Sequence, residues 1–310
     1  LSHPLGMLAM ALIHFLFAKD LRDNQGLDKG FKEIFEKILD IRVQIYQPAR
    51  IILFCHTIGL YRTDNNWATK NLLPLLDQQK NSEAVLMWRS LVVSLRFYGP
   101  FLTKVSSIIF GMAKHYSKLR FEAGRYADFM TYVALNKDRI FSDSKLKEVF
   151  CSLPVKGLEQ IAFVLRQYLE NSDKKSECWE KQIRVFFEKF WPVDREKRSS
   201  ELSVRLIKVA LQSGDKFPQA VSVVAPFLIP LERELYSISH EMACSGVCEK
   251  YPEASLLLLE NICPSAGKYI QGNFAVKQCL KLIGQNDDIG KLKRYKQLNN
   301  RVGAIMQIEK

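Results

Sequence analysis

Three side chains in the C-terminal half have the types and spacing of zinc ligands. Residues 240–244 match the pattern His-Glu-x-x-His, except that Cys244 takes the second ligand position after His240, and Cys248 follows about one helical turn later. On an unbroken helix the three side chains would share a face, and thiolates with an imidazole suit zinc. Gly246 interrupts that helix, however, and no fourth ligand lies nearby. We therefore favour the alternative, core thiols beside a surface histidine, and expect no metal.

Glycine patterns that hold phosphate are absent. No two of the 15 glycines are spaced two apart, so the Gly-x-Gly dinucleotide fingerprint does not occur. Gly284 and Gly290 imitate a P-loop, but five residues separate them and Leu292 replaces the magnesium-binding Ser or Thr. Asp287 and Asp288 would also repel a phosphate. We expect a helix C-cap followed by a loop here, and no cofactor.

Nucleophilic catalysis has no recognisable motif either. The Gly-x-Ser-x-Gly elbow does not occur, and the five histidines are scattered. Cys55 and His56 are sequence neighbours, which point in different directions on a helix, so we expect them to flank a helix–helix contact. The sequence therefore predicts no catalytic residue and no enzymatic activity.

Two basic clusters are candidates for contact with nucleic acid. The formal charge of the chain is +12, spread over both halves. The C-terminal cluster surrounds Tyr295, and bases with an interleaved aromatic can hold a phosphate backbone and stack on a base. Solvated helix faces would explain the same residues without a ligand. The candidates are Arg195, Lys197, Arg198, Lys291, Lys293, Arg294 and Lys296.

Apolar spacing predicts helices nearly everywhere. Stripes with helical period run through residues 85–95, 101–116 and 158–169, and each makes one apolar face that must pack on a neighbour. Residues 41–46 alternate like a strand, but they also fit a helix that begins near Phe31 and ends at Pro48, which we prefer. Other prolines and serine-led segments are typical of helix starts, at Ser82, Ser199, Pro100, Pro154, Pro218 and Pro252.

One internal repeat is visible in the second half. FPQA at the start of 217–230 recurs 34 residues later as YPEA at the start of 251–264, and LIP and ICP end the two segments. A period of 34 with two helices per unit is typical of helical solenoids, because one hairpin cannot bury its apolar face alone. Coincidental proline-capped helices are the alternative. The predicted fold is all-α, with antiparallel hairpins stacked as an irregular HEAT/TPR-like α-solenoid.

The chain is expected to form one helical array in two continuous parts, residues 1–191 and residues 192–310. The joint is a charged run after Trp191-Pro192. An odd number of cysteines, 7, within apolar stretches indicates a reducing compartment, so a cytoplasmic location is expected. Residues 5–17 are strongly apolar but too short to cross a membrane, and we expect a buried helix there. The first residue, Leu1, suggests a segment of a longer protein.

Four segments in order carry a family resemblance: WATKNLLPLLD (67–77), EAVLMW (83–88) leading to LRFYGPFL (95–102), SGDKFPQA (213–220) and SGVCEKYPEA (245–254). This set resembles the C-terminal helical region of large bacterial phage-defence proteins, notably those with an N-terminal sirtuin-like NAD-cleaving domain. The resemblance covers roughly residues 5–298, and its motifs are packing motifs, so no active-site residue is carried over. It implies that an effector elsewhere does the chemistry.

The function expected from these features is a non-catalytic module that senses or scaffolds in anti-phage defence. Its partner would be a protein: a trigger, an effector domain or another subunit. The alternative is a basic helical-repeat protein that binds DNA or RNA, by itself or as part of a nucleic-acid enzyme. One continuous basic groove would favour nucleic acid, and scattered charge would favour protein.

Overall fold

The computed structural model describes residues 3–19, 21–77, 81–136, 138, 140–194, 196–265, 270 and 272–303. Within these ranges every regular element is a helix, which confirms the all-α class. None of the helices in this part of the chain is long and apolar enough to cross a membrane. Contacts divide the protein into two compact units, Leu1–Leu153 and Pro154–Lys310. The joint expected after residue 191 lies inside the second unit, where the rings of Trp191 and Phe227 pack 6.0 Å apart.

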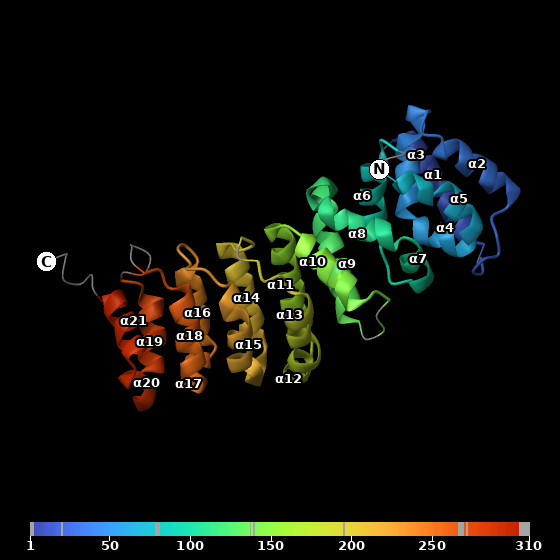
Figure 1. The fold of residues 1–310 in the computed structure, drawn as a ribbon. Helices are drawn as coiled ribbons and strands as arrows, with labels where there is room; N and C mark the ends of the chain where they lie inside the picture. Colours follow the sequence, from blue (N-terminus) through green and yellow to red (C-terminus); the bar gives the residue numbers. More distant parts are fainter. Residues whose placement is uncertain are drawn as a thin grey trace. The chain divides into compact units, whose positions relative to one another are not determined.

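The helices of the first unit are short and closely spaced (Figure 1). They are α1 (Pro4–Phe17), α2 (Lys29–Leu39), η1 (Gln44–Tyr46), α3 (Gln47–Cys55), α4 (Thr57–Thr63), α5 (Asn65–Asn71), η2 (Leu73–Leu76), α6 (Ala84–Ser94), α7 (Gly99–Lys104), α8 (Ser106–Lys114), η3 (Tyr116–Glu122), α9 (Ala123–Leu135) and α10 (Asp143–Ser152). Here η marks a 3-10 helix. The helix α1 packs on α3, and α3 packs on α6.

The helix α1 is only partly buried, in contrast to the sequence expectation. Ala9, Ile13 and Leu16 face the core and are at most 1% exposed. Leu8 and Phe15 are 58% and 64% exposed. The apolar residues of α1 therefore cover more of its circumference than the neighbouring helices bury.

Residues 41–46 do not continue the preceding helix, so that expectation is wrong. The helix α2 ends at Leu39, and α3 begins at Gln47 with Pro48 in its first turn, where the missing N–H is tolerated. Arg50 stabilises the intervening turn, because its guanidinium donates hydrogen bonds to carbonyl oxygens in and next to the turn. Its Nη1 donates to the backbone oxygens of Ile38 (3.1 Å), Asp40 (2.9 Å) and Val43 (3.0 Å).

Arg50 also joins α3 to the start of α6. Its side chain is fully buried, and its Nε and Nη2 each donate to Glu83, the N-cap residue of α6, at 2.9 Å. Burial raises the pKa of Glu83, but hydrogen bonds from Arg50 and Gln47 outweigh it and hold that pKa below its usual 4.5. This buried bidentate pair is an electrostatic clamp at the centre of the first unit.

The second unit repeats one order of elements four times: a first helix, a short helical turn and a second helix. The first helices are α11 (Val155–Glu170), α14 (Ser200–Gln212), α16 (Leu235–Cys244) and α19 (Phe274–Ile283). The short turns are α12 (Lys175–Cys178), η5 (Gly214–Lys216), α17 (Val247–Lys250) and α20 (Asp287–Lys291). The second helices are the π-helix η4 (Trp179–Ile183) with α13 (Arg184–Phe190), α15 (Phe217–Val224) with η6 (Ala225–Phe227), α18 (Pro252–Ile262) and α21 (Lys293–Gly303).

Equivalent helices of successive motifs pack on one another. The first helices contact in the order α11, α14, α16 and α19, and among the second helices α13 contacts α15 and α15 contacts α18. Figure 1 shows α14, α16 and α19 side by side in this order. Each motif therefore covers the apolar face of the one before it.

The two segments of the sequence repeat occupy equivalent positions in successive motifs. Pro218 and Pro252 both lie in the first turn of the second helix, as predicted. Gly214 and Gly246, which end the preceding helices, both have left-handed backbone angles, φ +63° and +75°. Glycine suits this conformation because it has no Cβ. The copies differ near Pro226, which lacks an N–H, and there the second helix changes to the 3-10 helix η6.

Candidate functional site

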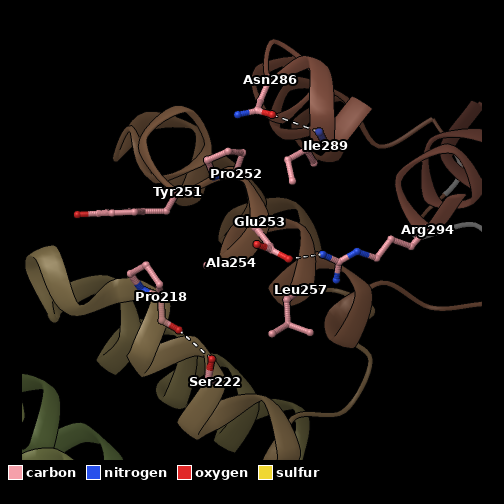
Figure 2. A pocket seen from close by; sticks show the side chains of 10 residues that line it. All are labelled: Pro218, Ser222, Tyr251, Pro252, Glu253, Ala254, Leu257, Asn286, Ile289 and Arg294. Carbon is pink, nitrogen blue, oxygen red and sulfur yellow. Dashed lines mark hydrogen bonds and ion pairs between the residues drawn. The ribbon is translucent and has the colours of Figure 1, made fainter. Parts of the chain in front are cut away.

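The motifs formed by α14–α15, α16–α18 and α19–α21 enclose a pocket of about 510 Å³ (Figure 2). Its position follows from local sequence signals, because its walls are the first turns of helices. Pro218 and Pro252 start two of them, and Asn286 caps α20 by accepting the N–H groups of Asp288 and Ile289 at 3.2 Å. The lining residues are Pro218, Ser222, Tyr251, Pro252, Glu253, Ala254, Leu257, Asn286, Ile289 and Arg294.

The lining combines apolar and polar side chains and contains one ion pair. Figure 2 shows the Tyr251 ring at the left of the pocket, with Pro252 above it and Pro218 below it, and Leu257 further to the right. Arg294 Nη2 lies 3.0 Å from Glu253 Oε1, and Arg294 Nη1 lies 3.4 Å from Glu260. The guanidinium is therefore balanced by carboxylates from the neighbouring motif. Its side chain is 35% exposed, so it remains within reach of a ligand.

A second ion pair lies at the rim, where Tyr251 joins the pocket to the turn of the preceding motif. Asp215 Oδ1 accepts hydrogen bonds from Lys250 Nζ at 2.6 Å and from the Tyr251 hydroxyl at 3.1 Å. These bonds, that from Lys250 first, hold the pKa of Asp215 below its usual range. The Tyr251 ring is thus fixed by its hydroxyl and by its contact with Phe217, 5.9 Å between centroids.

The polar side chains of the pocket can hold a ligand in place. No cysteine or histidine lines the pocket, and its serine, Ser222, donates to the carbonyl oxygen of Pro218 at 3.0 Å rather than to a base. A nucleophile needs a base within hydrogen-bond reach. A pocket of this size with apolar walls and a few polar groups is typical of ligand-binding sites.

The candidate zinc ligands are split between two environments. His240 and Cys244 are exposed on α16, with 3.6 Å between Cys244 Sγ and His240 Nε2. Gly246 ends the helix, and Cys248 is buried on α17, facing Cys279. Among the residues that the structure describes, no group of three or more His, Cys, Asp or Glu side chains is arranged to hold a metal.

Two buried cysteines of this unit, Cys263 and Cys279, are protonated core thiols. The hydrogen bond with Cys248, together with burial, holds the pKa of Cys279 well above its usual range. Cys279 Sγ also donates to the Ser239 carbonyl oxygen at 3.0 Å. Burial raises the pKa of Cys263 to about 12. Since the thiolate is the reactive form, Cys263 and Cys279 are unreactive at neutral pH.

The C-terminal basic cluster does not form one free cationic surface. Lys291, Lys293 and Lys296 are exposed, but Arg294 is paired with the two glutamates of α18. Tyr295, the expected stacking residue, packs against Gly284, and its hydroxyl donates to the Leu280 carbonyl oxygen at 2.9 Å. Gly284 itself caps the C-terminus of α19, as expected, but the loop expected after it contains the short helix α20. Of this cluster, only the three lysines remain accessible to a nucleic acid.

The other basic cluster is partly tied to the protein. Arg198 Nη2 donates to the Pro226 carbonyl oxygen at 2.6 Å, and Lys197 is half-buried. Arg195 lies outside the described residues. The sequence also suggested that Cys55 and His56 flank a helix–helix contact, and both lie at the junction between α3 and α4.

Of the pocket residues, sequence reasoning singled out only Arg294 as a binding candidate, and for nucleic acid, although a signal for the others was present. The repeated Phe/Tyr-Pro motif places Pro218, Tyr251 and Pro252 on adjacent motifs. These residues line one pocket because the motifs pack against each other, and that packing cannot be read from the sequence. Comparison of the chain with protein-family models, with curated protein sequences and with solved structures gives no match in any of the three.

Proposed function

We propose that this chain is a non-catalytic recognition module, an irregular HEAT/TPR-like α-solenoid whose pocket at Tyr251 and Leu257 binds a protein partner. The observation that carries the proposal is the composition of this pocket. It is lined by proline, tyrosine and leucine from successive motifs, and its charged groups neutralise one another. Stacked helical motifs typically present such extended concave surfaces to peptides.

The repeated packing of helices supports the solenoid part of the proposal. Among the second helices α13 contacts α15 and α15 contacts α18, and the ion pairs Lys216–Glu180 and Lys250–Asp215 join successive motifs at 2.7 Å and 2.6 Å. In such an array the motifs share a similar backbone fold and differ in their exposed side chains. Specificity then depends on exposed residues, which leave no motif in the sequence.

The resemblance of residues 67–102 and 213–254 to bacterial phage-defence proteins supplies the biological setting that we propose. In this setting the module recognises a trigger or holds an effector subunit, and an effector elsewhere performs the chemistry. Arg294 is paired with Glu253, and the Tyr295 hydroxyl is bonded to the Leu280 carbonyl oxygen. Because neither side chain is free to contact nucleic acid, a protein partner is favoured at this end of the chain.

The test is to fill the pocket without disturbing the fold. Ser222 is exposed at the pocket on α15, so Ser222→Arg would place a long side chain into the space. Ser237→Arg on α16 is the matched control, because Ser237 is also exposed and donates to a carbonyl oxygen of the preceding turn. Bacteria that express the protein with either change would be challenged with phage and scored for plaques.

We expect Ser222→Arg to lose protection and Ser237→Arg to keep it, with equal melting temperatures for both. A photo-crosslinking amino acid at position 222 should capture one phage or effector protein in infected cells. Full protection by Ser222→Arg would contradict a role for the pocket. Crosslinking to nucleic acid alone would contradict the protein partner.

A further inference from the structure

A second surface, in the first unit, shows an aromatic ring standing free among positive charges. Phe121, at the end of η3, is 93% exposed, more than any other large apolar side chain of the described residues. The turn is anchored beneath it, since Leu119 and Tyr116 are 0% and 7% exposed. The ring is therefore held outward by a firmly packed turn.

The backbone at this point is strained. Arg120 has φ 52° and ψ −121°, a conformation that suits glycine. The other non-glycine residue with positive φ among the described residues is Asn24, a type that tolerates it. Strain of this kind persists where the surroundings enforce it, and it is concentrated at ligand-binding sites. Here it places Arg120 and Phe121 next to each other at the surface.

The charge around Phe121 is strongly positive. Residues 96–125 contain six Lys or Arg residues and a single acid, Glu122. Lys118, Arg120 and Arg125 are all exposed. Glu122 is paired chiefly with Arg89 of α6, at 2.8 Å and about one-fifth exposed, although Arg125 also acts on its carboxylate. The fully exposed charges next to the ring in the sequence are therefore mainly cationic.

We propose that this surface, Lys118, Arg120, Phe121 and Arg125, binds single-stranded nucleic acid, with Phe121 stacking on an unpaired base and the cations contacting the adjacent phosphates. Proteins that bind single strands combine these two elements, an exposed aromatic platform and a basic track along the backbone. The proposal is independent of the proposed function, because the peptide pocket lies in the second unit and shares no residue with it.

The composition of the surface favours nucleic acid over an acidic protein. At protein interfaces an aromatic anchor typically lies in a well-packed, desolvated pocket whose surrounding contacts exclude water, unlike the 93% exposed ring of Phe121. Phe121 has the charged side chains of Arg120 and Glu122 on either side in the sequence and lies within a basic stretch. A nucleobase needs only the face of the ring, and its strand supplies one phosphate for each nucleotide.

The first experiment uses Phe121→Trp as an optical probe. All four natural tryptophans are at most 5% exposed, so the new indole would be the one tryptophan in contact with solvent among the described residues. We expect oligothymidylate to quench and blue-shift its emission on binding, and oligouridylate in a parallel titration shows whether DNA or RNA is preferred. Binding measured by anisotropy without any change in tryptophan emission would overturn the stacking assignment.

The second experiment measures affinity for labelled oligothymidylate with the full chain. Phe121→Ala should weaken binding by about ten-fold or more, because one base–aromatic stack supplies that much. Phe274→Ala, which removes a 69% exposed ring in the second unit, should have no effect. Both residues are at the surface, so equal melting temperatures would exclude unfolding as the cause.

The salt dependence identifies the cations. Each contact with a single-stranded phosphate contributes about 0.7 to the slope of log affinity against log salt, so Lys118→Ala and Arg125→Ala should each lower the slope by about that amount. An unchanged slope in both variants would overturn the proposal. So would equal affinity of Phe121→Ala, or binding of an acidic peptide that depends on Phe121 while oligonucleotides do not bind.

Discussion

The ring of Phe217 packs against the ring of Tyr251, with 5.9 Å between centroids and 33° between ring planes. The two residues are equivalent positions of the 34-residue repeat, so a residue of one motif contacts its own counterpart in the next. Phe217 is fully buried, as predicted from its place before a helix-starting proline, while Tyr251 is half-buried at the pocket. One aromatic position therefore serves the core in one motif and the surface in the next.

Phe217→Ala should lower the free energy of unfolding by about 3–5 kcal/mol, because it removes a completely buried ring between two motifs and leaves a cavity. Chemical denaturation monitored by circular dichroism measures this. Tyr251→Phe is the control, since it keeps the ring and loses only the bond to Asp215, and it should change stability little. A cost below about 1 kcal/mol for Phe217→Ala would contradict its role in joining the motifs.

Arg50→Met should destabilise the first unit by about 3–5 kcal/mol, because the buried Glu83 and three carbonyl oxygens would lose their partner. Arg42→Ala provides the comparison, since Arg42 is 87% exposed in its pair with Asp40 and its loss should change stability little. Equal melting temperatures for the two variants would show that the buried clamp is dispensable.

The same clamp predicts a pH dependence. The pKa of Glu83 is lower in the folded protein than its usual 4.5, so its stabilisation is complete above about pH 4.5 and is lost as the pH falls through the folded-state pKa. We expect the free energy of unfolding to decrease on acidification from pH about 5 to about 3, and Glu83→Gln to flatten this decrease. A slope that is the same in Glu83→Gln and wild type would assign the effect to other carboxylates.

Arg120→Gly should have opposite effects on stability and binding. It relieves a conformation that costs on the order of 1–3 kcal/mol, less the entropy that glycine adds to the unfolded chain, so the protein should gain about 1 kcal/mol. It also removes one cation beside Phe121, so affinity for oligothymidylate should fall. Thermal melts and anisotropy titrations on one preparation would measure both. A less stable variant would show that the Arg120 side chain contributes more than the strain costs.

Zinc should be absent from the purified protein, and a chelator should leave the melting temperature unchanged, because a structural zinc ion is coupled to folding. The split of His240 and Cys244 from Cys248 gives the physical reason. Elemental analysis decides this. Stoichiometric zinc that disappears in Cys244→Ser would establish a metal site instead.

The chain should turn over neither NAD nor ATP, because it lacks both glycine patterns that cradle phosphate. Product assays with each nucleotide measure this directly. Turnover that co-purifies with the chain and persists in a second, independent preparation would contradict the proposed module.

The sequence by itself determined the helical class and most helix starts. Apolar stripes and first-turn prolines are local signals, so Pro218, Pro252 and the Ser199 cap could be placed without a fold. It also identified the repeat that contains Phe217 and Tyr251. The order of elements shows four such motifs, but the sequence revealed only two, because only these two share similar residues.

Only the tertiary structure decided what depends on distant partners. Pro48 was expected to end a helix and instead begins one, because Arg50 and Glu83, 33 residues apart, stabilise the turn before it. Tyr295 was expected to be free, but Leu280 binds its hydroxyl. Phe121 was not noticed among the aromatics, since its exposure depends on the backbone of Arg120. Local patterns fix secondary structure, whereas exposure and pairing are properties of contacts between segments far apart in the chain.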